Sequence, residues 1–153
     1  MSDLQVRIVR LEPMRVACVS GFGANPEEQA WKTLLDWAAR KGLLADLKVR
    51  RFFGFNNPDP SPGSPNYGYD QWMTVGPDVE PEGEIKIREF PGGLYSVVRC
   101  EGLPNPEIWK QLVMWCEDSP YKYAHHQWFE ECLTPPGTPW EEAVFDLYLP
   151  IAE

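Results

Sequence analysis

Residues 31–37 read Trp-Lys-Thr-Leu-Leu-Asp-Trp, and residues 109–115 read Trp-Lys-Gln-Leu-Val-Met-Trp. The shared pattern, Trp-Lys-x-Leu-x-x-Trp, uses four of the seven tryptophans in the chain, which makes a coincidence a poor explanation. In both segments the apolar residues recur at the spacing of one face of an α-helix. The sequence therefore predicts two amphipathic helices that belong to an internal repeat.

The residues around the two helices repeat as well. Asn-Pro-Glu precedes each helix, at 25–27 and at 105–107. Asn can cap a helix, Pro suits the first helical position, and Glu favours the positive end of the helix dipole. β-prone runs lie before each helix, and an alternating, strand-like run closes each copy, at 69–75 and at 145–151. Each copy is therefore predicted to run strand, strand, helix, Pro/Gly loop, strand, with room for a short strand before the loop.

The two copies form one domain in this interpretation. The boundary between them falls at 76–83, which is rich in Gly, Pro and acidic residues. Copies of this size are each small for an independent hydrophobic core. We therefore predict a single domain over 1–153 with pseudo-two-fold symmetry, in which the first repeat covers about 5–76 and the second about 84–151.

Composition limits the classes of function. The net charge of −9 and the pI near 4.7 disfavour a direct nucleic-acid partner. No stretch is apolar enough to span a bilayer, and the first residues do not resemble a signal peptide. The four cysteines form no CxxC pair, which favours buried free thiols in a reducing compartment. We expect a cytoplasmic protein without a membrane partner; the sequence carries no signal for an oligomeric state.

Metal and nucleophile motifs are weak. His126 and Glu130 are four residues apart, which would suit a pair of ligands on a helix, but no third ligand follows at a recognisable spacing. Phosphate-binding, dinucleotide-binding and nucleophile-elbow motifs do not occur in the sequence. Cys132 near His126 is better explained as a core or loop thiol. We predict no metal site and no cofactor.

The closing strands have two different sides, because alternate residues of a strand face opposite ways. The more apolar side of each is predicted to pack beneath its helix. The other side carries Trp72 beside Asp70 in the first copy, and Tyr148 beside Asp146 in the second. These mixed sides are consistent with a cleft where the copies meet and also with ordinary packing, so both interpretations stay open.

The repeat shows where the copies differ. When Phe55 is aligned with Phe129, neutral Asn56 falls opposite Glu130, and Glu131 follows. A symmetric cleft would then carry a carboxylate on one side only. A carboxylate beside aromatic rings can bind a cation or act as a base. The alternative is a solvated pair of acids at a helix end.

The chain resembles the GyrI-like small-molecule-binding family, which is related to the effector-binding domains of AraC-type regulators. The resemblance covers about residues 5–151 and rests, besides the doubled unit, on three segments. These read Phe-Gly-Phe-Asn-Asn-Pro at 53–58 with Tyr-Asp-Gln-Trp at 69–72, Trp-Phe-Glu at 128–130, and Phe-Asp-Leu-Tyr-Leu-Pro-Ile at 145–151.

The resemblance implies an α+β fold of duplicated β-α-β-β units, in which two helices pack on an antiparallel sheet and a ligand cleft lies between the halves. It also implies a cleft glutamate that pairs with lipophilic cations. By motif this glutamate is Glu130, although Glu131 is only one residue away. Some stand-alone members are implied to hydrolyse cyclopropane-bearing toxins that alkylate DNA, whereas others bind gyrase or sense drugs.

Three hypotheses follow. The first is a binder of aromatic, lipophilic and cationic small molecules that serves in toxin or drug protection. The second is a hydrolase that opens cyclopropanoid electrophiles, with Glu130 as the catalytic base. The third is a module that binds a protein partner such as gyrase, because the acidic surface could imitate nucleic acid. The predicted ligand-binding residues are Glu130, Glu131, Phe55, Asn56, Tyr69, Trp72, Trp128 and Tyr148.

Overall fold

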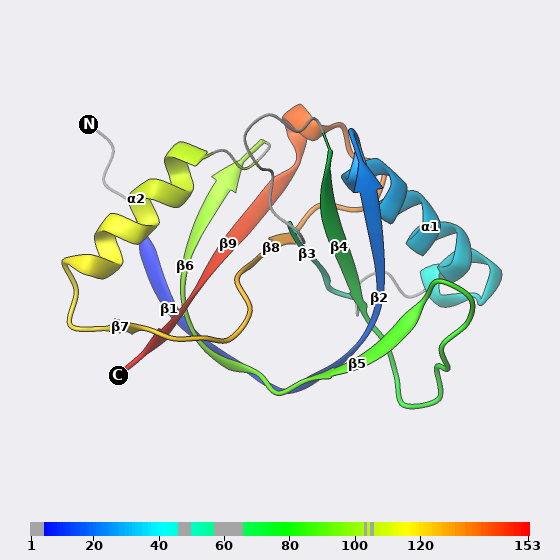
Figure 1. The fold of residues 1–153 in the computed structure, drawn as a ribbon, viewed down its shortest axis with the longest axis horizontal. Coiled ribbons are helices and arrows are strands. Elements are labelled where there is room, and N and C mark those ends of the chain that lie inside the picture. The colour runs from blue at the N-terminus through cyan, green and yellow to red at the C-terminus, as the bar shows by residue number, and fades with distance from the viewer. Residues whose placement is uncertain (1–4, 46–49, 57–65, 103, 105) are drawn as a thin grey trace. The chain divides into compact units, whose positions relative to one another are not determined.

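The computed structural model describes residues 5–45, 50–56, 66–102, 104 and 106–153. The chain divides into two compact units. The central unit is Met14–Phe90, and the terminal unit combines Met1–Pro13 with Pro91–Glu153. Each unit contains one of the two predicted helices and an antiparallel sheet, so the α+β fold of duplicated β-α-β-β units is confirmed (Figure 1).

Among its described residues, the central unit has four strands and one α-helix. Its sheet has the order β3-β4-β2-β5, and every pairing is antiparallel. The elements in chain order are β2 (Met14–Gly23), α1 (Pro26–Arg40), β3 (Phe52–Asn56), β4 (Tyr67–Thr74) and β5 (Lys86–Phe90).

The terminal unit has the same plan. Its strands follow the order β1-β6-β9-β8, again antiparallel, and the short strand β7 also pairs with β9. The elements are β1 (Val6–Leu11), β6 (Gly93–Glu101), α2 (Pro106–Glu117), β7 (Lys122–Tyr123), β8 (Phe129–Cys132), the 3-10 turn η2 (Trp140–Glu142) and β9 (Val144–Ala152).

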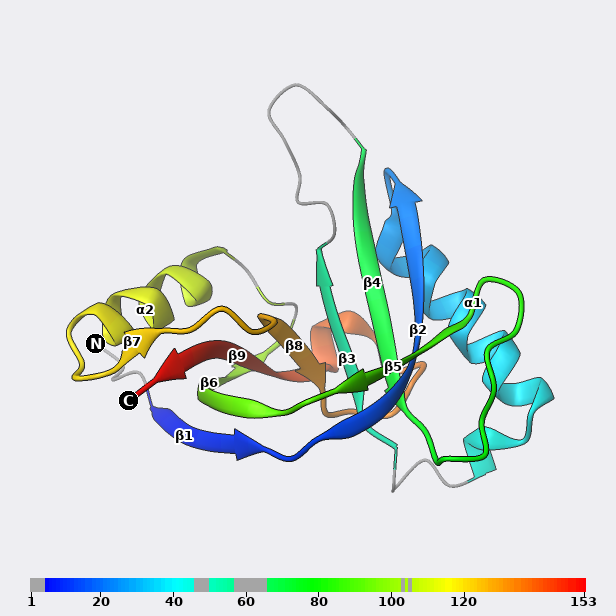
Figure 2. The ribbon, with the colours of Figure 1, turned by 60° about the horizontal axis from the view of Figure 1, so that its bottom comes forward.

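The sequence repeats and the structural units are not the same segments, because one strand of each repeat is exchanged. Strand β1 comes from the first repeat but pairs with β6 of the second, and β5 comes from the second repeat but pairs with β2 of the first (Figure 2). Gly92, in the connection between β5 and β6, has φ +83°, and a Cβ atom there would collide with the carbonyl oxygen of Leu11. The exchange therefore depends on a close backbone approach that favours glycine.

Helix α1 lies against one face of the central sheet. Pro26 occupies its first turn as predicted, but Asn25 makes no side-chain capping hydrogen bond. A Cβ atom at Gly21 would collide with the carbonyl oxygen of Pro26. Because glycine has no side chain, the first turn of α1 can pack directly on the backbone of β2. Trp37, which the sequence pattern places at the border of the apolar face, is 1% exposed, whereas Trp31 is only partly buried.

Helix α2 covers the terminal sheet in the predicted way. Leu112 and Cys116 are its buried residues, and they belong to the same hydrophobic cluster as alternate residues of β9. Those residues of β9 are Phe145, Leu147, Leu149 and Ile151. The prediction that the apolar side of the closing strand packs beneath its helix is confirmed. The Pro/Gly loop predicted in the first repeat, which the prolines at 58, 60, 62 and 65 place at 58–65, and the predicted cap at Asn105 lie outside the described residues.

Candidate functional site

The terminal sheet has a second face, turned away from α2, which we call the polar face. Because side chains alternate along each strand, the residues between those of the α2 core point to this side. It is formed by Arg7 of β1, Tyr95, Val97 and Arg99 of β6, Phe129 and Glu131 of β8, and Asp146 and Tyr148 of β9. Every one of these strands belongs to the terminal unit.

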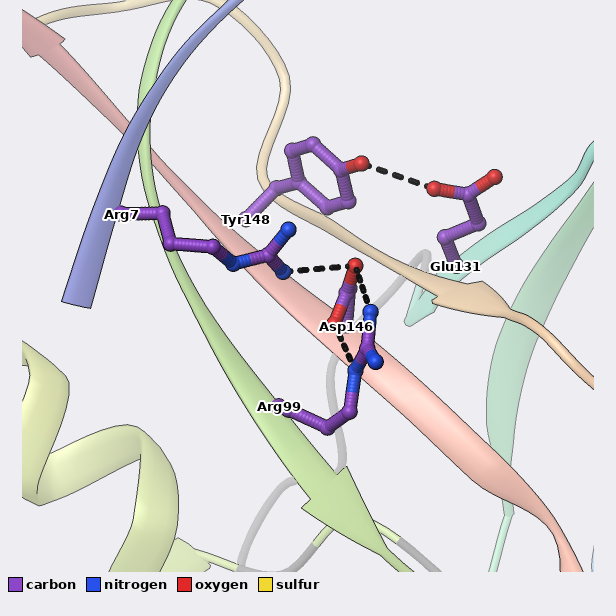
Figure 3. A network of polar contacts seen from close by, with 5 residues as sticks. All are labelled: Arg7, Arg99, Glu131, Asp146 and Tyr148. Carbon is purple, nitrogen blue, oxygen red and sulfur yellow. Dashed lines mark hydrogen bonds and ion pairs between the residues drawn. The ribbon is translucent and has the colours of Figure 1, made fainter. Parts of the chain in front are cut away.

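The polar face holds a hydrogen-bonded carboxylate and phenol. The hydroxyl of Tyr148 donates to Oε1 of Glu131 over 2.7 Å (Figure 3). Glu131 is 5% exposed and Tyr148 is 3% exposed. A carboxylate loses much of its hydration when it is buried, and a hydrogen bond from a hydroxyl offsets part of that cost. Glu131 and Tyr148 therefore form a buried acceptor and donor that are already oriented.

Strand alternation separates the two neighbouring glutamates that the sequence could not distinguish. In β8, Glu131 is opposite Asp146 of β9, whereas Glu130 is opposite Leu147. Since Leu147 belongs to the core beneath α2, Glu130 points to the α2 side, where it is partly exposed. Both residues lie in a strand, so the alternative of two acids at a helix end, and a helical pairing of His126 with Glu130, do not occur. The structure brings Glu131, and not Glu130, beside Tyr148.

Aromatic rings surround the Glu131–Tyr148 pair. Phe129 lies 5.2 Å from Tyr148 between ring centroids, and Tyr95 lies 5.4 Å from Tyr148 and 5.2 Å from Phe129. The Tyr95 hydroxyl donates to the carbonyl oxygen of Gln127 over 2.7 Å, and burial raises the pKa of Tyr95 far above its usual range. Tyr95 therefore serves as a neutral packing ring, while Phe129 and Tyr148 flank the carboxylate.

An ion-pair cluster lies beside this aromatic group. Arg99 Nε and Nη2 contact Oδ1 and Oδ2 of Asp146 at 3.1 and 3.4 Å, and Arg7 Nη2 lies 2.8 Å from Oδ2 of the same carboxylate (Figure 3). Asp146 raises the pKa of Arg99, chiefly through this hydrogen bond. Asp146 stands out in the sequence pattern but the two arginines do not, and Arg7 could not be placed because nothing in the sequence indicates that β1 joins β6. Only the exchanged strand brings Arg7 to this face.

The central unit also has a face turned away from its helix, and it is aromatic. Phe55 and Trp72 meet edge to face with centroids 5.3 Å apart, and Trp72 lies 5.6 Å from Phe90. Asp70 is on the same side, where its Oδ1 accepts a hydrogen bond from the Ser20 hydroxyl over 2.5 Å. Two predicted ligand-binding residues, Phe55 and Trp72, therefore contact each other directly.

The remaining predicted residues lie elsewhere. Tyr69 is on the α1 side of β4, because it is opposite Gly21 of β2, where a Cβ atom would collide with Pro26 of α1. Asn56 is the exposed last residue of β3. Trp128 is 40% exposed and lies 5.8 Å from Trp109 of α2 between ring centroids. None of these three contributes to the polar face as the side chains are arranged here.

The metal and thiol alternatives find little support in the described part of the chain. His126 Nε2 lies 2.8 Å from the carbonyl oxygen of Leu94, which can only accept, so this nitrogen carries the proton. The Cys132 thiol donates to the carbonyl oxygen of Thr134, and burial raises its pKa, so it is not an activated nucleophile. Among the described residues, no group of three or more His, Cys, Asp or Glu side chains could hold a metal ion.

Comparison with known proteins identifies a family. The model of the GyrI-like small-molecule-binding domain matches residues 4–152, nearly the whole chain. Among curated proteins, no sequence matches this chain at a significant level. Of the helices in the described residues, none is long and apolar enough to cross a membrane.

Solved structures share the fold at low sequence identity. The C-terminal domain of EcmrR is 14% identical with a TM-score of 0.72, and the match covers 98% of each chain. A hydrolase from Listeria innocua is 13% identical with a TM-score of 0.71, covering 99% of this chain and 94% of that one. SAV2435 bound to tetraphenylphosphonium is 12% identical with a TM-score of 0.53, covering 97% and 94%.

Proposed function

Because this chain belongs to the GyrI-like small-molecule-binding family, we propose that it binds aromatic, lipophilic small molecules at the polar face of the terminal unit. In this proposal the ligand presents a positive charge or a hydrogen-bond donor to Glu131. Phe129 and Tyr148 provide ring surface, which suits flat apolar groups and cations. The Phe55–Trp72 pair of the central unit is a second stacking surface of the same chemistry.

The observation that carries the proposal is the buried Glu131–Tyr148 hydrogen bond. A core that served stability alone would gain more from apolar residues than from a buried carboxylate, whose desolvation costs several kcal/mol. Groups of this kind are common in binding sites, where they are oriented in advance for a ligand. The complex of the structurally similar SAV2435 with tetraphenylphosphonium, an aromatic cation, supports the same ligand class.

The test compares two adjacent glutamates. Phenylnaphthylamine, a neutral aromatic amine, is titrated by its fluorescence, and tetraphenylphosphonium is then used to displace it. Glu131→Gln keeps the size of the side chain and an acceptor for Tyr148 but removes the charge, so we expect tetraphenylphosphonium to bind about tenfold more weakly. Glu130→Gln, on the α2 side, makes the same chemical change and is expected to alter the affinity less than about twofold.

Two outcomes would contradict this proposal. The first is that neither compound binds to the folded protein. The second is that Glu130→Gln and Glu131→Gln weaken binding equally, which would mean that the loss comes from overall charge and not from the polar face. Tyr148→Phe adds a further check, because it removes the hydrogen bond to Glu131 while it keeps the ring.

A second candidate function is hydrolysis of a cyclopropanoid electrophile, and the 2.7 Å Tyr148–Glu131 contact favours it. Glu131 would take a proton from water while the water oxygen bonds to a ring carbon. The electrons of the breaking C–C bond would pass to the conjugated carbonyl oxygen. Once Glu131 has taken the proton from water, the Tyr148 hydroxyl would turn from Glu131 and donate its hydrogen bond to the developing phenolate. The fold shared with a hydrolase from Listeria innocua is consistent with this chemistry.

Turnover distinguishes the two candidates. The protein is incubated with a cyclopropanoid compound in isotope-labelled water, and the product is analysed by mass spectrometry. A hydrolase incorporates one labelled oxygen per molecule, and Glu131→Gln abolishes this reaction whereas Glu130→Gln does not. A binder protects the compound unchanged, and it can be recovered intact when the protein is denatured.

A further inference from the structure

We infer that Arg7 and Arg99 form a binding subsite for an anionic group, so that the polar face selects aromatic ligands which carry an acid group as well as a donor. This inference rests on the proposed function, because the acid group belongs to the same ligand that meets Glu131.

This part of the polar face carries more positive than negative charges. Two guanidinium groups share one carboxylate, because Arg7 and Arg99 both contact Asp146. Arg99 already satisfies both oxygens of Asp146, through Nε and Nη2. The second arginine is therefore more than charge neutralisation requires, and the three residues together carry one net positive charge.

The exposure of the side chains points the same way. Asp146 is only 5% exposed, whereas the side chains of Arg7 and Arg99 are 48% and 56% exposed. The shared carboxylate thus holds the inner edges of both guanidinium groups, and their outer edges reach solvent. A guanidinium has five N–H donors in a planar fork that matches carboxylate, sulfonate and phosphate groups. Two such forks fixed on one buried anion form an anion site that needs little reorganisation.

The register of the sheet places the anion subsite beside the Glu131–Tyr148 pair. Asp146 is opposite Arg99 in β6 on one side and opposite Glu131 in β8 on the other. The anion subsite and the Glu131–Tyr148 pair therefore occupy neighbouring strands of one face. With Glu131 included, the charges of two arginines and two carboxylates cancel, so the polar face does not select cations by net charge. It suits a ligand with an acid group at one end and a donor or positive charge near the other.

Two related dyes test this inference. Anilinonaphthalenesulfonate and phenylnaphthylamine share the aromatic rings and the amine N–H, and only the first carries a sulfonate. The measured quantity is the ratio of their dissociation constants, taken by fluorescence at constant ionic strength. We expect Arg7→Gln or Arg99→Gln to weaken the sulfonate about tenfold and the neutral dye less than about twofold. Arg7→Lys keeps the charge and should retain most of the preference.

The chain offers a matched control. Arg10 lies on the same strand as Arg7, three residues on and therefore on the opposite side, and pairs at 3.9 Å with exposed Glu153. Arg10→Gln removes the same charge and should leave the ratio unchanged. The inference is overturned if neither Arg7→Gln nor Arg99→Gln changes the ratio in a folded protein, or if Arg10→Gln changes it equally. If the neutral dye binds and the arginine variants leave the ratio unchanged, the subsite is refuted but the proposed function stands. If the wild-type protein binds neither dye, both are refuted.

A competition experiment identifies the source of the anion. Sodium benzoate and sodium phosphate are added separately, at equal ionic strength, to the protein with bound anilinonaphthalenesulfonate. Displacement by benzoate supports an aromatic acid as the ligand. Displacement by phosphate alone would assign the arginines to an inorganic anion and would overturn the ligand class inferred here.

Discussion

Replacing Asp146 by Asn tests the ion-pair cluster in the absence of any ligand. The change keeps the size of the side chain but removes the charge that holds Arg7 and Arg99. Breaking a buried pair costs about 3–5 kcal/mol when a buried charge is left behind. Here both arginines are about half exposed and can be hydrated, so we expect a smaller loss of about 2 kcal/mol in the free energy of unfolding.

Urea unfolding, followed by tryptophan fluorescence, measures this loss. Asp36→Asn is the control, because Asp36 forms an exposed pair with Lys32 within one helix, and we expect a change within about 0.5 kcal/mol. A double-mutant cycle of Asp146→Asn with Arg99→Gln should show a coupling of about 1 kcal/mol. A loss for Asp146→Asn as small as that for Asp36→Asn, or a coupling near zero, would refute the reasoning.

Three further predictions concern backbone, pH and thiols. Gly92→Ala should cost about 2 kcal/mol or more of unfolding free energy in urea titrations because φ is +83° and a backbone oxygen is close, whereas Gly76→Ala should be nearly neutral; equal effects would contradict this. Burial and then the hydrogen bond to Glu27 raise the pKa of Tyr67 from 10.0 to about 12, so its stabilising contribution is complete below pH 10 and lost as the pH rises to 12. Tyr67→Phe should remove that alkaline loss, and an unchanged stability curve would contradict it. Burial raises the pKa of all four thiols, so a thiol reagent should react slowly until the protein unfolds; rapid reaction of Cys132 in the native protein would be evidence against this.

The repeat in the sequence predicts the elements of the fold because local patterns determine them. The spacing of apolar residues indicates both helices, and alternation identifies the face of β9 that packs beneath α2. The pairing of strands is not local. No local pattern in β1 (6–11) or β5 (86–90) indicates that the strand joins the sheet of the other repeat. Arg7 therefore could not be assigned to a site from the sequence.

The same limit applies to the candidate site. Alignment of the repeats indicates the place where the copies differ, at Glu130 and Glu131. The choice between them depends on the register of β8, because a shift of one residue exchanges the two faces of a strand. Tyr69 and Trp72 show a related limit. Alternation puts them on opposite sides of β4, and the structure shows that Tyr69 lies on the α1 side, because it is opposite Gly21, where a Cβ atom would meet Pro26 of α1.

A crystal structure of the complex with phenylnaphthylamine would show whether the polar face of the terminal unit binds an aromatic ligand through Glu131. We expect the amine nitrogen within about 3.2 Å of a Glu131 carboxylate oxygen, with a ring against Phe129 or Tyr148. A dye bound on the α2 side, beside Trp128 and Glu130, with Glu131 beyond hydrogen-bond distance, would refute the proposed binding site.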